Sequence, residues 1–489
     1  MEGFSLKYAL ALLVIGLLAF VIYLWKLNQA LRLTPPDVLA LSPNRWTDQK
    51  IKETYQKIKN NPISWAEKLP PKLNRRYIVT GGSGGVGGQI ILHLLERGQS
   101  PESIRNVDFR APERRDMQSG PAAAVPFIHA DISSASSTNA AFSAAWPDSV
   151  AKLPLTVFHV AAVIVPHERS MALFERVKRV NIDGTENVLN ASKAVGTDVF
   201  IATSSSSVAL VPVQYWGIPW KGWPRNFVQA VDESDFDKPL KKHEQFFSNY
   251  GHAKAVAERL VCNANSPNFR TGVVRPGNGI YGNSHGDQLV GALLRAEVVP
   301  TWTRNIYQNC VHIGHVSLGH LLFEAALASN AKMPQCAGRP FLITDPGAAP
   351  LFQDYYRLLQ SLAITPVKVI PVPPAVMLLL AYVVEAFDSL SQFPGFKWAK
   401  PKGDLAMLQP SIFSAATHVP ILDAAAKKSV AEGGLGYKGV CTTMEGMCQQ
   451  LLDWNMEHEN RAHERNDKPL ATVAQSARNV ATVPAAVKG

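Results

Sequence analysis

The stretch Tyr77-Ile-Val-Thr-Gly-Gly-Ser-Gly-Gly-Val-Gly87 decides the fold of this chain. It opens with a short apolar run, 77–79, which is typical of a buried parallel strand. The glycines at 81, 84 and 87 predict a tight turn whose backbone can approach a pyrophosphate and lets the next helix pack on the strand. Residues 89–98 have the pattern of that helix, whose N-terminus would offer free N–H groups to a phosphate.

A second apolar segment, 104–110, supports a dinucleotide-binding interpretation. It carries Asp108 at about 20 residues past the turn, where a carboxylate normally holds the ribose 2′-hydroxyl of a bound nucleotide. The alternative is a glycine-rich loop that binds nothing. The order strand, turn, helix, strand and aspartate counts against that alternative.

Strand and helix patterns alternate over the whole segment that follows residue 76. The candidate strands are 77–80, 107–110, 127–130, 157–161, 199–203 and 272–274. This alternation predicts an α/β fold with a Rossmann-type, doubly wound parallel sheet. The regularity is lost after residue 274. We therefore expect an NAD-binding Rossmann domain over 75–274 and a smaller C-terminal substrate-binding region over 275–457.

The N-terminal segment 8–25 is almost wholly apolar. It has about the length that a helix needs to span a bilayer, and Tyr8, Tyr23 and Trp25 lie where interfacial aromatic residues belong. A cleaved signal peptide is the alternative, but its apolar region is shorter and no small-residue cleavage site follows Trp25. We predict one transmembrane helix within 1–28. The excess of Lys and Arg after it favours a cytosolic catalytic domain.

Three other segments have simpler patterns. Residues 29–74 form a polar, basic, proline-containing linker, and 458–489 lack periodicity and are predicted to be a disordered tail. The apolar stretch 376–384 is too short to span a bilayer. We expect a buried helix there. The aromatic residues that follow, including Phe393 and Trp398, make a helix at the membrane interface the alternative.

Composition excludes several classes of function. The 489 residues are enough for a sizeable core, and the net charge of +10 is not gathered in a dense basic run, which argues against nucleic-acid binding. Weak attraction to an anionic membrane remains compatible with this charge. The five cysteines form no CxxC pair. They indicate a reducing compartment and no metal site.

Two groups of residues have the chemistry of a catalytic site. Tyr250 and Lys254 are four positions apart at the start of a helical pattern, so the phenol and the ammonium would share one face. A nearby cation lowers a tyrosine pKa and suits proton exchange with an alcohol. The hydroxyl cluster 203–207 follows a candidate strand, at the sheet edge where ligands bind in such folds. An ordinary helix surface and a serine-rich turn are the structural alternatives.

Several motifs together resemble a known family. They are Thr80-Gly-Gly-Ser-Gly-Gly-Val-Gly87, Val107-Asp-Phe-Arg110, His129-Ala-Asp131, Val157-Phe-His-Val-Ala-Ala162, Val180-Asn-Ile-Asp-Gly-Thr-Glu-Asn-Val188, Tyr250-x-x-x-Lys254 and Val274-Arg-Pro-Gly-Asn-Gly-Ile-Tyr-Gly282. Residues 75–457 resemble the extended short-chain dehydrogenase/reductase superfamily. The likeness is strongest to its 3β-hydroxysteroid dehydrogenase branch, especially the decarboxylating sterol-4α-carboxylate 3-dehydrogenases.

The resemblance implies a catalytic role for three residues. Tyr250 would be the acid/base, and Lys254 would bind the nicotinamide ribose and lower the Tyr250 pKa. The family's Ser-x-x-Val pattern selects Ser205 as the catalytic hydroxyl, with Ser204 and Ser206 as competitors.

The resemblance also implies a cofactor site. Its residues would be Gly81, Gly84 and Gly87 at the pyrophosphate, Asp108 at the adenosine ribose, Asp131 and Ile132 at the adenine, Ala161 and Ala162 after the fourth strand, and Tyr250 and Lys254 at the nicotinamide ribose. The cofactor is expected to be NAD, because the carboxylate of Asp108 repels a 2′-phosphate. Arg110 keeps NADP as an alternative. Asn181 matches the asparagine that orders the site, and Asn278 and Tyr281 would lie over the nicotinamide.

Two departures from the family pattern stand out. The segment between Ser205 and Tyr250 is longer than usual and contains Trp216, Trp220, Trp223 and Phe227. An aromatic lid over a large apolar substrate and ordinary loop packing are both open for the insertion 216–227. The segment 311–315 lacks the acidic residue of the family pattern.

The expected function is NAD-dependent oxidation of a 3β-hydroxyl on a sterol or triterpenoid, with a 4-carboxylate that is then lost as carbon dioxide. The alternatives are a 3β-hydroxysteroid dehydrogenase/isomerase, a reductase of another lipophilic carbonyl, and an inactive NAD-binding scaffold. The implied partners are a lipophilic polycyclic substrate and a membrane, with the endoplasmic reticulum as the expected location. Homodimers are common in the superfamily, but no residue pattern here demonstrates one.

Overall fold

In the computed structural model of the chain, the described residues are 2–219, 222–284, 286–296, 298–329 and 333–459. At its centre lies a seven-stranded sheet with the order β10-β6-β5-β4-β1-β2-β3, and every pair in it is parallel. The predicted Rossmann-type sheet is therefore confirmed. Its strands are β1 Arg76–Thr80, β2 Ile104–Asp108, β3 Phe127–His129, β4 Leu155–His159, β5 Val199–Thr203, β6 Arg270–Pro276 and β10 Pro340–Ile343.

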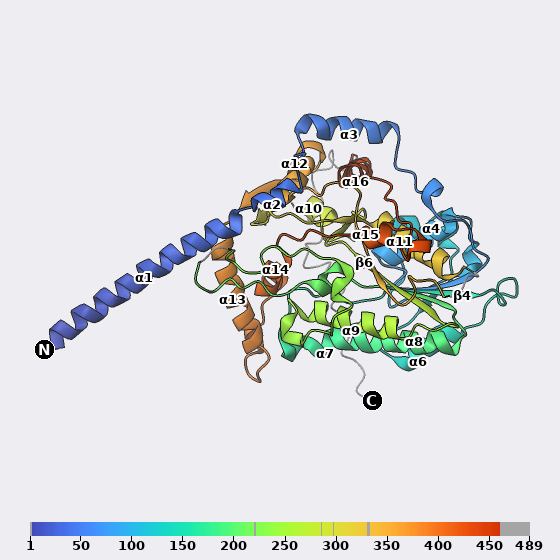
Figure 1. Ribbon diagram of the computed structural model, residues 1–489, viewed down its shortest axis with the longest axis horizontal. Helices are drawn as coiled ribbons and strands as arrows, with labels where there is room; N and C mark the ends of the chain where they lie inside the picture. The colour runs from blue at the N-terminus through green and yellow to red at the C-terminus, as the bar shows by residue number, and fades with distance from the viewer. Residues whose placement is uncertain (1, 220–221, 285, 297, 330–332, 460–489) are drawn as a thin grey trace.

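Helices cover both faces of this sheet, because side chains of a strand alternate between them. Tyr77 and Val79 of β1 belong to the core that the sheet shares with α4 (Gly85–Glu96) and α11 (Ile313–Leu327). Ile78 points into the second core, which is built with α6 (Ala135–Ser143), α8 (Gly184–Ala194) and α9 (Asn249–Asn263). Figure 1 shows α8 and α9 along one side of the sheet and α4 and α11 on the other.

The last strand of the sheet lies outside the predicted Rossmann domain. β10 pairs with β6 at the edge of the sheet, and α11 packs on α4, so both complete the domain from beyond residue 274. β10 has only four residues between loops, too few for an alternation of apolar and polar residues to indicate a strand. The predicted boundary at 274 therefore falls within β6, and the sheet continues beyond it.

The described residues also form further helices and two small sheets. The helices are α2 Pro36–Ala40, α3 Asp48–Asn60, α5 Gly120–Ala123, α7 Phe174–Lys178, α10 Val290–Arg295, α12 Phe352–Leu362, α13 Pro374–Leu390, α14 Pro410–Ala415, α15 Ala424–Lys427 and α16 Thr443–His458. Two small parallel sheets pair β7 Ile280–Tyr281 with β9 Val311–His312, and β8 Val298–Thr301 with β11 Lys368–Pro371. The predicted tail 458–489 lies outside the described residues, apart from His458 and Glu459.

The segment expected to be a linker is folded against the C-terminal region. In α3, Ile51 and Ile58 are buried in one cluster with residues of α12 and α16, and Figure 1 shows α3 lying across both helices. Ile51, Tyr55 and Ile58 recur at helical spacing, and the Thr47 side chain caps the helix by accepting from the Lys50 N–H. Its many lysines hide this narrow apolar stripe in the composition.

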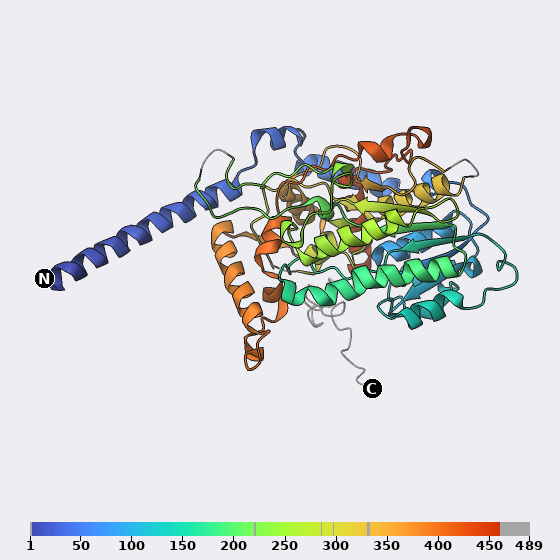
Figure 2. The ribbon, with the colours of Figure 1, turned by 60° about the horizontal axis from the view of Figure 1, so that its bottom comes forward.

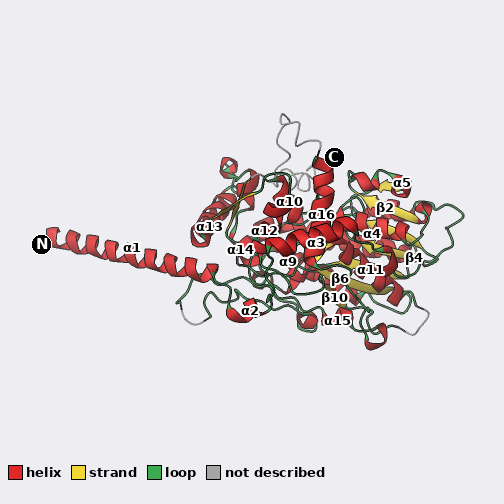
Figure 3. Cartoon of the chain, turned by 90° about the horizontal axis from the view of Figure 1, so that it is seen from above, coloured by secondary structure: helices red, strands yellow, loops and turns green. Residues whose placement is uncertain are grey.

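The N-terminal helix α1 (Glu2–Arg32) leaves the body of the protein. Its last turns are anchored, since Leu27 and Leu31 are buried, whereas the apolar residues before Tyr23 are exposed. Figure 2 and Figure 3 show the helix projecting alone from one end of the body. By length and composition it can cross a membrane, although a signal sequence passes the same test. The prediction of an N-terminal apolar helix is confirmed to that extent.

Candidate active site

The glycine-rich turn lies at the carboxyl end of β1. Gly81 has a φ of +70° and donates its N–H to the Val107 oxygen at 2.9 Å. A Cβ on Gly81 would come within 2.7 Å of the Ala161 nitrogen, and one on Gly87 would strike the Gly81 carbonyl. Both positions therefore require glycine. Helix α4 begins here without a side-chain cap, which leaves its first N–H groups available to an anion.

Asp108 lies at the end of β2, next to this turn. Its carboxylate accepts from the Ser83 N–H at 3.0 Å and from the Arg110 N–H at 3.2 Å. Burial raises the pKa of Asp108, and the backbone donors oppose that effect. The side chain is thus held rigidly at the place where the ribose is expected.

The other predicted cofactor residues lie at the same edge of the sheet. Asp131 follows β3, and its carboxylate accepts from the Ser133 N–H at 2.9 Å. Ile132 is buried, and its carbonyl accepts from the Asn187 amide at 2.9 Å. Ala161 and Ala162 are half-buried after β4, with Ala161 directly beside Gly81.

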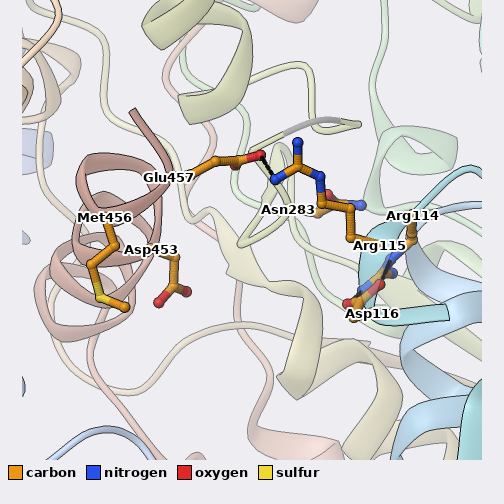
Figure 4. Close-up of a pocket in the computed structure, with 7 residues that line it drawn as sticks. All are labelled: Arg114, Arg115, Asp116, Asn283, Asp453, Met456 and Glu457. Atoms are coloured by element: carbon orange, nitrogen blue, oxygen red, sulfur yellow. Dashed lines mark hydrogen bonds and ion pairs between the residues drawn. The ribbon is translucent and has the colours of Figure 1, made fainter. Parts of the chain in front are cut away.

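One pocket opens beside the start of α4, with a volume of about 450 Å³. Arg114 lines it and donates to the Gly85 carbonyl at 2.7 Å. Figure 4 shows Arg115 and Glu457 approaching each other across the pocket, where they form an ion pair of 2.7 Å. The pocket flanks the predicted pyrophosphate site. No role had been assigned to these two arginines from the sequence.

Tyr250 and Lys254 lie in the first turns of α9 and are both buried. The Ser248 hydroxyl caps this helix by accepting from the Gly251 N–H at 3.1 Å. The Lys254 ammonium donates to the Thr203 carbonyl at the end of β5, at 2.8 Å. Burial lowers the pKa of Lys254 to about 8, against the influence of Glu258.

The pKa of Tyr250 differs from the expectation. Burial raises it to about 12, and a hydrogen bond with the Ser205 side chain opposes that effect. The expected lowering by Lys254 is therefore not the dominant influence. The physical reason is that the buried phenolate loses its hydration.

Of the three candidate serines, Ser205 is the one whose side chain influences the pKa of Tyr250. Its oxygen accepts from the Ser207 N–H at 3.2 Å and from the Ser207 hydroxyl at 2.8 Å. The hydroxyls of Ser204 and Ser206 are buried and have no partner among the described residues. The geometry thus brings Ser205, Tyr250 and Lys254 together where β5 ends.

Asn181 lies in a π-helical turn, Arg179–Asp183, before α8. Its amide accepts from the Val163 N–H at 2.8 Å and donates to the Val163 carbonyl at 2.9 Å. It therefore fixes the loop after β4, which agrees with an ordering role. Such π-turns frequently occur at functional sites.

Tyr281 lies elsewhere than the resemblance implied. Its side chain is fully buried, and its hydroxyl donates to Asp345 at 2.7 Å, so it is part of the core instead of a loop over the nicotinamide. The same carboxylate accepts from the His312 N–H and contacts the His315 ring, both at 2.7 Å. Asp345, which follows β10, therefore places a buried carboxylate against segment 311–315. Asn278 is half-buried and contacts the Ala415 carbonyl at 3.4 Å.

The insertion 216–227 packs against the base of α1. The Trp216 and Trp223 rings lie 6.2 Å and 5.5 Å from the ring of Tyr23, whose hydroxyl donates to the Tyr215 carbonyl at 3.1 Å. Phe227 is buried against His418. This favours loop packing over a lid for the described part of the insertion. Trp220 lies outside the described residues.

His159 is a site residue that had no predicted role. Its ring contacts the Thr80 hydroxyl at 2.8 Å and the Thr185 hydroxyl at 2.9 Å, so it joins β1, β4 and α8 beneath the site. Burial, followed by the charge of Lys254, lowers the pKa of His159 to about 3. Its position inside the 157–162 motif was the available signal.

We predict that acid destabilises the protein through its buried histidines. Burial lowers the pKa to about 3 for His93, His159 and His312 and to about 4 for His320. Unfolded histidine titrates near pH 6.5, so below that pH the unfolded state binds more protons and stability falls, by about 1.4 kcal/mol per pH unit for each histidine. Asp287 acts in the opposite direction, because burial raises its pKa to about 6.

The measurement is the thermal unfolding midpoint of the solubilised protein at pH 7 and at pH 5. We expect the midpoint to fall, and to fall less in a His320→Gln variant. Replacing the exposed His129 by glutamine should leave the pH dependence unchanged. An equal midpoint at both pH values would contradict the prediction.

Among the described residues, no group of three or more His, Cys, Asp or Glu side chains is placed to hold a metal ion. The polar groups of the site are instead hydroxyls, one ammonium and backbone N–H groups around the carboxyl ends of β1, β4 and β5. Such a set can bind a dinucleotide and exchange a proton with an alcohol.

The chain has relatives among known proteins. The profile of the 3-beta hydroxysteroid dehydrogenase/isomerase family matches residues 78–373. The chain is 27% identical over 295 residues to mouse 3 beta-hydroxysteroid dehydrogenase type 7, covering 57% of this chain and 70% of that protein. It is 27% identical over 296 residues to the 3 beta-hydroxysteroid dehydrogenase/Delta 5→4-isomerase of Mycobacterium tuberculosis, covering 58% and 69%. It is 28% identical over 305 residues to the human decarboxylating sterol-4-alpha-carboxylate 3-dehydrogenase, covering 60% and 69%.

Solved structures agree at the level of the fold. A UDP-glucose 4-epimerase of Thermotoga maritima with UDP-glucose superposes with a TM-score of 0.51 at 18% identity, covering 78% of this chain and 99% of that one. A UDP-glucose-4-epimerase of Stenotrophomonas maltophila with bound NAD superposes with a TM-score of 0.51 at 16% identity, covering 79% and 99%.

Proposed function

The chain belongs to the 3-beta hydroxysteroid dehydrogenase/isomerase family, and on that premise we propose that it oxidises the 3β-hydroxyl of a membrane-dissolved sterol with NAD. It is an oxidoreductase that acts on CH–OH groups. The observation that carries the proposal is the convergence of Ser205, Tyr250 and Lys254 at the carboxyl end of β5.

Each of these residues has a chemical task in the proposed reaction. Tyr250 takes the proton of the substrate hydroxyl, and Ser205 holds the oxygen by a hydrogen bond. The Lys254 ammonium, fixed by the Thr203 carbonyl, binds the ribose beside the reacting carbon and favours the phenolate form of Tyr250. The NAD, when bound, accepts the hydride. Because the side chains of Tyr250 and Lys254 are buried, water is kept from this proton transfer.

The residues around the glycine-rich turn fit a dinucleotide. Glycine at 81 and 87 leaves the cradle that a Cβ would fill, and the uncapped start of α4 faces it. Gly84, Asp131, Ile132, Ala161 and Ala162 complete the proposed cofactor site. NAD is supported over NADP by the rigid carboxylate of Asp108, while Arg114 on the other side of the turn is the residue that NADP could use.

The cofactor preference gives a testable prediction. Replacing Asp108 by serine removes charge-assisted hydrogen bonds to the ribose, each with a contribution of about 1.5–3 kcal/mol. We expect kcat/KM for NAD to fall by a factor of about ten to a hundred and the value for NADP to rise. The Asp148→Ser variant, at an exposed carboxylate in the loop after α6, is the matched control. If the ratio of kcat/KM for NAD to kcat/KM for NADP is unchanged, Asp108 does not bind the ribose.

The finer part of the proposal concerns the substrate. We propose a 3β-hydroxysterol that carries a 4-carboxylate, because its oxidation gives a β-keto acid that loses carbon dioxide without another catalytic group. The similarity to a decarboxylating sterol-4-alpha-carboxylate 3-dehydrogenase supports this choice. The similarity to a dehydrogenase/Delta 5→4-isomerase supports the second candidate, oxidation followed by migration of a double bond.

One assay separates these candidates. The full-length, detergent-solubilised protein is incubated with NAD and either a 3β-hydroxysterol-4-carboxylate or a Δ5-3β-hydroxysteroid. NADH together with the decarboxylated ketone, identified by mass spectrometry, supports the first candidate. NADH together with the ultraviolet absorbance of a conjugated enone supports the second. NAD binding without turnover on either substrate would leave a reductase of another lipophilic carbonyl or an inactive scaffold.

We also propose that α1 is a single-pass anchor in the membrane of the endoplasmic reticulum, with the catalytic domain in the cytosol. The exposed apolar length of α1 supports the anchor, and the excess of Lys and Arg after it supports the orientation. Protease added outside sealed microsomes should digest the domain. Protection of the domain would reverse the orientation.

A further inference from the structure

One face of α13 is apolar and exposed. Val376, Leu380, Val383 and Phe387 are 58%, 39%, 50% and 44% exposed, and their spacing places them on one side of the helix. The opposite side, which includes Leu378, Ala381 and Val384, is buried. Contiguous apolar surface of this kind marks an interaction site more often than scattered residues do.

The apolar surface continues into the turn that follows α13. Phe393, Phe396 and Trp398 are 62%, 42% and 71% exposed. Three exposed lysines, Lys397, Lys400 and Lys402, lie in the same segment. Aromatic and aliphatic residues with neighbouring cations are typical of segments that lie in the headgroup region of a bilayer.

This surface adjoins the base of the proposed anchor. Leu27 and Leu31 of α1 and Leu378 and Ala381 of α13 belong to one buried cluster. Figure 1 and Figure 2 show α13 at the end of the body from which α1 leaves, running across the direction of α1 and not along it. A bilayer crossed by α1 would therefore meet the outer side of α13.

We propose that α13 and the turn after it dock on the lipid bilayer that α1 crosses. The docking surface consists of Val376, Leu380, Val383, Phe387, Phe393, Phe396 and Trp398, and the three lysines beside it contact anionic headgroups. The proposal rests on α1 as an anchor and not on the identity of the substrate. Continuity with α1 and the adjacent lysines favour a bilayer over a second copy of the chain, whose lysines would face one another.

The docking surface is connected to the active site. Glu385 of α13 accepts two hydrogen bonds of 2.6 Å from Arg169, which lies in the loop after β4. The same loop holds Asn249, the neighbour of Tyr250, because the Glu168 carbonyl accepts from its N–H at 2.8 Å and the Ser170 carbonyl from its amide at 2.9 Å. Docking therefore fixes the site at the surface of the phase in which a sterol dissolves.

The test places a fluorophore on the docking surface of the full-length protein in vesicles of phosphatidylcholine and phosphatidylserine. The label is attached to a Val383→Cys variant, since all five native cysteines are buried. Lipids brominated in the upper acyl chain should quench it at least about threefold more than a label on Ser136→Cys, an exposed position of α6. A third label, on Leu13→Cys of α1, reports whether the anchor is inserted.

Each outcome decides the proposal. Strong quenching at 13 and 383 with weak quenching at 136 supports docking. Quenching at 13 alone overturns it and leaves α1 as a simple tether. No quenching at 13 or 383 overturns both the anchor and the docking surface. At high protein density in the vesicles, the label at 383 could lose its quenching while chemical cross-links form between copies. That result would overturn the proposal, because a second copy of the chain would then cover the docking surface.

A functional readout is independent of the label. The Val376→Glu/Val383→Glu variant changes only exposed positions, so turnover of a detergent-dispersed substrate should equal that of the unchanged protein. With substrate dissolved in vesicles, we expect its KM to rise roughly fivefold or more, because two apolar contacts with lipid are lost. Equal KM values in vesicles would overturn the proposal. If no sterol is turned over in detergent, the proposed function fails, and the quenching result still decides the docking.

Discussion

Replacing Tyr250 by phenylalanine is expected to lower turnover by a factor of about 10² to 10⁴, which is the usual contribution of a positioned acid/base. Only the hydroxyl of the phenol is removed, and Tyr250 is buried beside Ser205 at the start of α9. The NAD affinity should stay within about twofold, because the glycine-rich turn and Lys254 remain in place. The measurements are initial rates of NADH formation and NAD binding by calorimetry.

The matched control is Tyr356→Phe. Tyr356 is also buried, and its hydroxyl contacts Thr301 and Thr303, at 2.8 Å and 2.9 Å, in the C-terminal region. Loss of a hydroxyl from that tyrosine should leave turnover nearly unchanged. If Tyr250→Phe keeps turnover within about tenfold of the unchanged protein, the proton is taken elsewhere and the assignment of Tyr250 as acid/base is wrong.

The parts of the fold that could be predicted are those with a strong local signal. The glycine-rich turn predicted the first strand and helix, because a φ of +70° at Gly81 together with its closeness to Ala161 requires glycine. Periodicity then located the strands of the Rossmann domain to within a few residues, and β5 agrees with its predicted bounds. The spacing of Tyr250 and Lys254 predicted that both lie on α9, where the structure places them as buried side chains.

The parts that could not be predicted depend on distant contacts. β10 is four residues long and is recognisable only by its pairing with β6. The carboxylate that serves His312 and His315 comes from Asp345, about thirty residues later in the chain, so no local motif reveals it. Burial is also a property of the whole fold. The pKa of Tyr250 is therefore raised in this structure, where the pair of residues alone predicted a lowering.

The second large effect is expected for Arg275, which is 1% exposed in β6. Its guanidinium donates to Glu258 at 2.5 Å and 2.9 Å and to Asp235 at 2.6 Å and 3.2 Å. Glu258 is itself buried on α9, one turn after Lys254. These bonds hold α9, which carries the proposed catalytic residues, against the sheet.

An Arg275→Met variant should lose about 3–5 kcal/mol of unfolding free energy, because it leaves the Glu258 carboxylate buried without its partner. The measurement is denaturant unfolding of the solubilised protein. Arg339→Met is the control, because Arg339 and its partner Asp237 form an exposed ion pair at 3.0 Å, and pairs of that kind contribute less than about 1 kcal/mol.

A double variant distinguishes an unpaired charge from lost packing. Arg275→Met combined with Glu258→Gln removes the stranded carboxylate and should recover part of the stability, since the two changes share one interaction and are not additive. The remaining Asp235 is partly exposed and can be hydrated. If the double variant is less stable than Arg275→Met alone, the guanidinium acts mainly by filling space between β6 and α9. If Arg275→Met is no less stable than Arg339→Met, the buried pair does not fasten α9 to the sheet.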